Sequence, residues 1–198
     1  MPLSSYHLLP EPSHSTLACT SLSILLQLDD KINRNAIHRF PFASYAAQYW
    51  IDHVRFRDMS LHVQDMVKHL FDLSQLHFVA WVWLYDVDRH WLDPMTEVHL
   101  MQPSAMPLYY ASLCGLHGLV EHLVAARPKE INASGRFYDT ALHAASAKGH
   151  FEIVQLLLNS DADPNLCDDD GEALLHSASQ NGHVEVMKIL LDRGVDMN

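Results

Sequence analysis

The chain has 198 residues, of which 48% are hydrophobic and 19% charged, so it can bury enough apolar surface to fold, and wholesale disorder is excluded. Its formal net charge is −11, and neither half gathers the Lys and Arg clusters on which phosphate-backbone binding depends, so nucleic acid is not an expected partner. The three cysteines are far apart and odd in number, which favours reduced thiols over a disulfide framework.

Neither a membrane anchor nor a secretory leader is expected. The longest apolar run, residues 78–85, is far shorter than the ~20 residues of a membrane-spanning helix. No cationic segment opens the chain, since its first basic residue is Lys31. Together with the reduced thiols, these features predict an intracellular protein that does not associate with membranes.

The first half of the chain reads as a helical unit over residues 13–92. Three prolines indicate a tail at 1–12, after which Ser13 is placed to cap a helix that runs to about Leu28. Pro41 suits the first position of a second helix. Its expected buried side consists of Phe42, Ala46, Tyr49, Trp50 and Val54.

Two further helices complete this unit. Ser60 is placed to start one of them, with Val63, Met66, Val67 and Leu70 at helical spacing. The run F-V-A-W-V-W-L-Y at 78–85 is ambiguous between a helix and a strand, and its helical surroundings favour a buried helix. All four tryptophans precede residue 92, and we interpret them as core rather than as a ligand box. Residues 93–102 form the connection to the second half of the chain.

The second half repeats itself with a period of 33 residues. T-A-L-H at 140–143 recurs as A-L-L-H at 173–176, and K-G-H at 148–150 recurs as N-G-H at 181–183. An earlier copy, M-P-L-Y at 106–109, stands 34 residues ahead of the first of these. This period and core pattern resemble the ankyrin repeat over residues 103–198.

The resemblance implies an all-α fold, in which the helical N-terminal unit precedes a solenoid of about three repeats at 103–132, 133–165 and 166–198. Stacking is required because no single repeat can bury its apolar face alone. We expect His143 and His176 to support the scaffold through buried hydrogen bonds. Two residues depart from the usual repeat pattern: Tyr109 replaces the repeat's histidine, and Tyr138 replaces a turn glycine. The second of these predicts a distorted loop, or finger, at the start of the second repeat.

Two short patterns in the first half are similar to the helical stretch that joins the NACHT module to the ankyrin array in fungal NOD-like receptors. One is H-x-x-L-A, beginning at His14, and the other is Y-A-A-x-x-W-x-x-H, ending at His53. Ser21 stands where that family often has Cys. The resemblance implies a self/non-self receptor whose ATP-binding module lies upstream. The motif G-x-x-x-x-G-K-[ST] does not occur in this chain, which suggests a fragment or a truncated relative.

We expect no enzyme activity, no metal site and no cofactor. The fifteen histidines include no H-E-x-x-H pattern, and no two cysteines have C-x-x-C spacing. A thiol enzyme using Cys114 is the alternative, but no G-x-S-x-G elbow or oxyanion loop accompanies any nucleophile.

The expected function is to bind a protein partner, whose identity the sequence does not give, through the concave surface of the repeats. The alternative is a sensor fragment of a NACHT–ankyrin receptor that couples ligand binding to an upstream NTPase module. The candidate contacts are Arg136, Phe137, Asp139, Ala147, Lys148, Asp169, Asp170, Glu172, Gln180 and Asn181. The acidic run that begins at Asp168 has two interpretations, a solvated turn or a recognition site for a basic partner.

The third repeat closes at Met197-Asn198 without the polar helix that caps a terminal repeat. This predicts a partly uncovered face that includes some of Leu175, Val186, Ile189 and Leu190. We therefore expect that the third repeat frays first, and that the chain self-associates or binds another repeat through this uncapped repeat.

Overall fold

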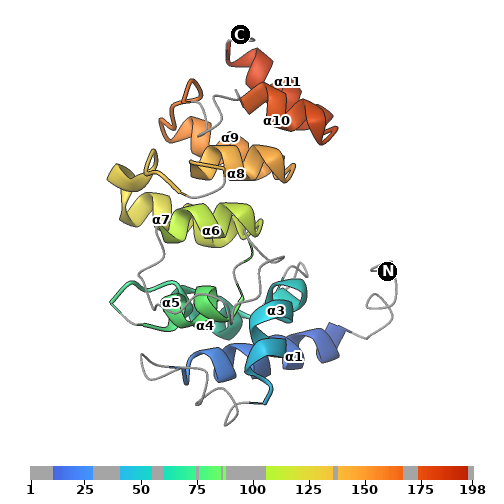
Figure 1. Cartoon of the computed structure of the whole chain (residues 1–198), viewed down its shortest axis with the longest axis vertical. Coiled ribbons are helices and arrows are strands. Elements are labelled where there is room, and N and C mark those ends of the chain that lie inside the picture. The colour runs from blue at the N-terminus through green and yellow to red at the C-terminus, as the bar shows by residue number, and fades with distance from the viewer. Residues whose placement is uncertain are drawn as a thin grey trace. The chain divides into compact units, whose positions relative to one another are not determined.

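A computed structural model describes most of the chain, and all the regular secondary structure in the described ranges is helical. Those ranges are 11–28, 41–54, 60–74, 76–85, 87, 106–135, 138–166 and 174–195. The chain divides into two compact units, Met1–Leu100 and Met101–Asn198 (Figure 1). The boundary lies two residues ahead of the expected start of the repeats at 103.

Four helices make up the described part of unit 1. They are α1 (Glu11–Leu25), α3 (Ala43–Val54), α4 (Leu61–Leu70) and α5 (His77–Leu84). Helix α1 packs along α3 and also contacts α4 and α5. Because α5 covers most of the ambiguous apolar run, the preference for a helix over a strand is confirmed.

The first helix begins and ends earlier than the sequence suggested. It starts at Glu11, so the last two residues of the expected tail are helical and Ser13 lies inside the helix. A proline is tolerated at position 12 because the first turn of a helix has no use for its missing N–H. After Leu25 the chain tightens into a turn, with Leu28 N donating to Leu25 O at 3.1 Å.

The second helix starts two residues later than expected, and this removes Phe42 from the core. Pro41 and Phe42 form a turn, and α3 begins at Ala43. The Phe42 side chain is 68% exposed because it precedes the helical periodicity that buries Ala46 and Trp50. The placement of Phe42 on the buried side was therefore wrong. The start at Ser60 is confirmed, since its Oγ accepts from Val63 N at 3.4 Å.

Aromatic rings fill the core of unit 1. Trp50 and Trp81 are fully buried, with ring centroids 5.4 Å apart in an edge-to-face arrangement. Phe71 lies 5.4 Å from Trp81 and 5.2 Å from Phe78. Trp81 Nε1 donates to Ala47 O at 3.0 Å, which ties α5 to α3. For these two tryptophans, the interpretation as core is confirmed.

Unit 2 is a stack of helix pairs that share one arrangement (Figure 1). The pairs are α6 (Pro107–Leu113) with α7 (His117–Ala126), α8 (Ala141–Ala147) with α9 (Phe151–Asn159), and α10 (Leu174–Gln180) with α11 (Val184–Asp192). A 3₁₀ turn, η2 (Pro128–Glu130), follows α7. Helix α8 contacts both α6 and α10, and α9 contacts both α7 and α11. The first helices of the pairs thus form one layer and the second helices another.

Capping and small residues explain why the pairs stack so regularly. Thr140 Oγ1 accepts from His143 N at 3.2 Å and caps α8, as expected from the sequence. Ala144, Ala145 and Ala178 are fully buried, which is consistent with close approach of neighbouring helices. The all-α expectation holds for every described element.

Candidate protein-interaction surface

The ends of two neighbouring helices carry exposed polar side chains at equivalent positions. Lys148 follows the last residue of α8, and Asn181, 33 residues later, follows the last residue of α10. Gln180, the last residue of α10, is also exposed. These three residues were expected to contact a partner, and their side chains are accessible to one. We call Lys148, Gln180 and Asn181, with Tyr138 and Asp139, the inner-helix surface.

An aromatic ring holds the lysine of this surface. Lys148 Nζ lies 5.4 Å from the centroid of the Tyr138 ring, within cation–π range. Sequence reasoning did not identify Tyr138 as part of the site. The available signal was that Tyr138 occupies a position where the repeat usually has glycine.

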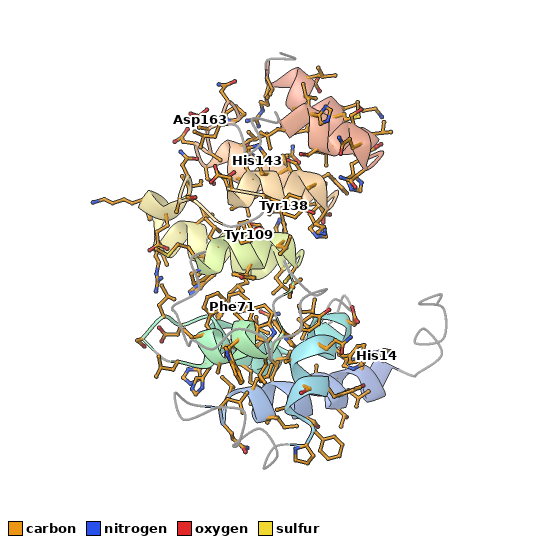
Figure 2. All side chains as sticks on the ribbon, viewed as in Figure 1. His14, Phe71, Tyr109, Tyr138, His143 and Asp163 are labelled. Atoms are coloured by element: carbon orange, nitrogen blue, oxygen red, sulfur yellow. The ribbon has the colours of Figure 1, made fainter. Side chains whose placement is uncertain are left out.

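The loop that carries Tyr138 is fixed by its own contacts. Tyr138 N donates to the hydroxyl of Tyr109 on α6 at 3.3 Å (Figure 2). Asp139 has a φ of 57°, in the left-handed region, and its Oδ1 accepts from Ser134 Oγ at 2.7 Å. A Cβ at Gly135 would collide with the Tyr109 ring, so only glycine fits beside that tyrosine. Two departures from the repeat pattern, Tyr109 and Tyr138, therefore contact each other.

One expected contact residue is not accessible. The Ala147 side chain is only 4% exposed, and its carbonyl accepts from His183 Nε2 at 3.1 Å. Its small side chain is covered by the neighbouring pair of helices, so Ala147 is removed from the candidate surface. Five other expected residues lie outside the described ranges. They are Arg136, Phe137, Asp169, Asp170 and Glu172.

Two histidines connect successive helix pairs in the same way. His150 Nε2 donates to Leu113 O at 3.3 Å, and His183 Nε2 makes the corresponding bond to Ala147 O. Each imidazole lies over a glycine, Gly115 or Gly149, where an added Cβ would collide with the ring. Among the residues that the structure describes, nothing lies within 4 Å of the corresponding position at Gly182. These bonds fix how the exposed helix ends are spaced.

His143 and His176 occupy the same place in the repeat but have different surroundings. His143 is buried, and its Nδ1 lies 3.0 Å from Thr140 Oγ1 (Figure 2). His176 is exposed, and its Nε2 lies 2.6 Å from Gln180 Nε2. The expectation that both imidazoles make buried hydrogen bonds is thus correct for His143 and wrong for His176. The physical reason is exposure: helix α8, which carries His143, lies between α6 and α10, whereas within the described ranges the main contact of α10 with the other first helices is with α8.

The outer layer offers a second, shallower surface. An open hollow on α7 and α9 is lined by His117, Glu152, Gln155, Leu156 and Asn159.

No group of three or more His, Cys, Asp or Glu side chains within the described ranges could hold a metal ion. Among the described helices, none is long and apolar enough to cross a membrane.

Comparison with known families identifies the repeats. A family model described as "Ankyrin repeats (3 copies)" matches residues 108–198. Those residues are therefore three ankyrin repeats. Alpha-latrocrustotoxin-Lt1a of Latrodectus tredecimguttatus is similar to the chain at 31% identity over 77 residues, 39% of this chain and 5% of the toxin.

A fungal relative resembles more of the chain than the repeats alone. The azaphilone pigments biosynthesis cluster protein L of Monascus ruber is 36% identical over 136 residues. The match covers 64% of this chain, whereas residues 108–198 make up less than half of it, so the similarity extends ahead of the repeats. This chain spans 29% of the length of the Monascus protein.

Proposed function

We propose that this chain binds a protein partner through the inner-helix surface of its ankyrin repeats. Ankyrin repeats are in general protein–protein interaction modules, and residues 108–198 are three of them. The observation that carries the proposal is the position of Lys148 over the Tyr138 ring. Lys148 is exposed and charged, and its side chain is positioned by contact with an aromatic ring rather than by burial.

The tyrosine ring prepares the lysine for binding. A free Lys side chain carries about 2 kcal/mol of rotamer entropy, part of which is lost when a partner immobilises it. Contact with Tyr138 restricts Lys148 before binding, so less entropy is lost at the interface. Exposed cation–π contacts of this kind contribute roughly 0.5–1 kcal/mol. At the equivalent end of α10, the exposed Gln180 and Asn181 add amide groups, and Asn181 Nδ2 is held by donating to Ser177 O at 2.8 Å.

The test requires a partner and a matched pair of lysines. A pull-down with the full chain from the source organism, followed by mass spectrometry, identifies the partner. Its affinity is then measured for Lys148→Ala and for Lys188→Ala. Lys188 is the control because it is also exposed but lies on α11, 3.3 Å from Glu185.

We expect Lys148→Ala to weaken binding by about tenfold, which corresponds to ~1.4 kcal/mol. Lys188→Ala should leave the affinity unchanged. Equal effects of the two substitutions, or an effect of Lys188→Ala alone, would place the interface elsewhere. An interface on the hollow of α7 and α9 would instead respond to Gln155→Ala.

We also propose that the chain acts by binding and not by catalysis. The alternative nucleophile, Cys114, is 1% exposed at the end of α6, which supports this proposal because a reactive thiol must be accessible. A thiol-reactive probe should leave Cys114 unlabelled in the native chain at neutral pH. Rapid labelling of Cys114 under those conditions would revive the thiol-enzyme alternative.

A second candidate is a sensor role in a NACHT–ankyrin receptor inside the cell. The observation in its favour is that the Monascus match extends ahead of the repeats, which supports a combined N-terminal unit and array as a recurring arrangement. In this role, unit 1 would relay ligand binding to an upstream NTPase module. The DNA directly upstream distinguishes the two candidates. A nucleotide-binding reading frame there would support the receptor role, and its absence would favour the binding function without a receptor.

A further inference from the structure

Two buried histidines face each other where α1 meets α3. His14 lies in the first turn of α1 and His53 in the last turn of α3, and each side chain is 3% exposed (His14 is labelled in Figure 2). Their Nδ1 atoms are 3.2 Å apart, and their ring centroids are 5.4 Å apart. They are also the first and last residues of the two patterns noted in the sequence, H-x-x-L-A and Y-A-A-x-x-W-x-x-H. The proposed binding function uses neither of them.

The distance between the two nitrogens limits how many protons the pair can hold. Two Nδ1 atoms at 3.2 Å share one hydrogen bond, so one ring donates and the other accepts. If both imidazoles were charged, each would direct an N–H at the other, and the bond would be lost. The pair is therefore compatible with neutral rings and is disrupted by full protonation.

The other nitrogen of His53 adds to this restriction. His53 Nε2 is buried and has no hydrogen-bond partner among the described residues. When His53 donates through Nδ1, its Nε2 is a bare lone pair, which costs less than an N–H without an acceptor. A second proton would place an unpaired N–H and a positive charge in a buried position, which is strongly unfavourable.

The surroundings act in the same direction. Burial lowers the pKa of His53, and the nearby His14 lowers it further, while Asp52 opposes them by raising it. Asp52 is exposed, so its charge is partly screened by solvent. The remaining titratable groups on the packed helices are Glu11 and Cys19 on α1, Tyr45 and Tyr49 on α3, the exposed His62, Asp65, Lys68 and His69 on α4, and His77 on α5. His77 Nδ1 lies 2.7 Å from Leu28 O, beyond the opposite end of α1.

We propose that His14 and His53 form a proton-sensitive latch that holds α1 on α3 at neutral pH and releases it in acid. The sign follows from linkage: when the folded-state pKa is below the unfolded value of about 6.5, the unfolded state takes up more protons as the pH falls. The stabilisation is therefore present above about pH 6.5 and is lost as the pH falls below it. The latch concerns the attachment of the first helix of unit 1 and stands independently of the proposed binding function.

Hydrogen exchange on the full chain tests the latch between pH 7.5 and 5.5, after correction for the intrinsic pH dependence of exchange. Amides of residues 15–25 should lose roughly tenfold of their protection at the lower pH, because α1 opens more often once the pair is protonated. Those of 151–158 in α9 should change little. In parallel, the emission of the buried Trp50, one turn before His53, should shift as α1 separates from α3.

A matched pair of variants isolates the histidines. His53→Gln keeps a hydrogen-bonding side chain but does not titrate, so the acid response of α1 should largely disappear. His69→Gln is the control, because His69 is exposed on α4 and should leave the response intact. A full acid response in His53→Gln would overturn the proposal.

A measurement on the unmodified chain covers the case in which His53→Gln does not fold. The ring protons of His53, followed by NMR, should not titrate near pH 6.5 while unit 1 remains folded. An ordinary titration of His53 in the folded chain, with no loss of α1 protection, would overturn the latch.

Discussion

The second and third repeats place the same residues in different surroundings. Gly149 and Gly182 have nearly the same backbone, with φ of 74° and 71°, but the His183 ring covers only Gly149. His143 is buried beside Thr140, whereas its counterpart His176 is exposed. A residue's position in the repeat therefore sets its backbone conformation. Its contribution to stability depends in addition on the contacts that the neighbouring repeat makes with it.

Of the substitutions that test this comparison, Gly149→Ala has the largest expected total effect on stability. An alanine in place of Gly149 or Gly182 must adopt the left-handed conformation, at a cost of about 1–2 kcal/mol. Gly149→Ala also displaces the His183 ring and breaks its bond to Ala147 O, which adds roughly 1–2 kcal/mol. Chemical denaturation of the two variants measures the difference, with Gly182→Ala as the control for the backbone cost. Equal destabilisation would mean that the imidazole contact contributes nothing.

His143→Ala has the next largest expected effect. His143→Ala removes a buried imidazole beside the Thr140 hydroxyl and should cost about 1–3 kcal/mol. His176→Ala removes an exposed ring and should stay within about 0.5 kcal/mol of the parent chain. Thermal unfolding of both variants compares them. If His176→Ala lowers the stability as much as His143→Ala does, exposure does not explain the different contributions of the two histidines.

The smallest expected effect on stability concerns the loops of these repeats. The third repeat has Asp169, Asp170 and Glu172 where the second has Arg136, Phe137 and Asp139. Replacing the three acidic residues by Asn and Gln should change the free energy of unfolding by less than about 0.5 kcal/mol. The same substitutions should lower the affinity for a basic partner. Added salt should slow the association of that partner with the parent chain, because charges are screened beyond ~8 Å at physiological ionic strength. If neither the substitutions nor added salt changes the binding, the acidic residues form only a solvated turn.

The sequence predicted the helices of the repeats closely because independent signals coincide there. The 33-residue offset, the Thr140 cap and the turn at Gly149 together place α8 at Ala141–Ala147, and α10 follows from the same offset. In unit 1 the only boundary signals were single residues. Prolines at 12 and 41 are compatible with several helix starts, so the first helix was expected three residues too late and the second two residues too early.

The candidate site was less predictable because exposure is a tertiary property. Ala147 and Lys148 are adjacent in sequence, yet one is covered by the next repeat and the other is open. The contact between Lys148 and Tyr138 joins the end of α8 to the loop before that helix, and the path of this loop depends on the left-handed Asp139. The meeting of His14 and His53 depends on how two helices pack, which no periodicity within one helix contains.

The contact between Tyr109 and Tyr138 has a consequence for consensus engineering of this array. Restoring the usual histidine through Tyr109→His alone would remove the hydroxyl that accepts from Tyr138 N and leave a gap beside Gly135. Restoring the usual glycine through Tyr138→Gly alone would remove the ring beneath Lys148. Because the Tyr109 hydroxyl accepts from the backbone N–H of position 138, this bond survives Tyr138→Gly but not Tyr109→His, so position 138 can be returned to the consensus with Tyr109 kept.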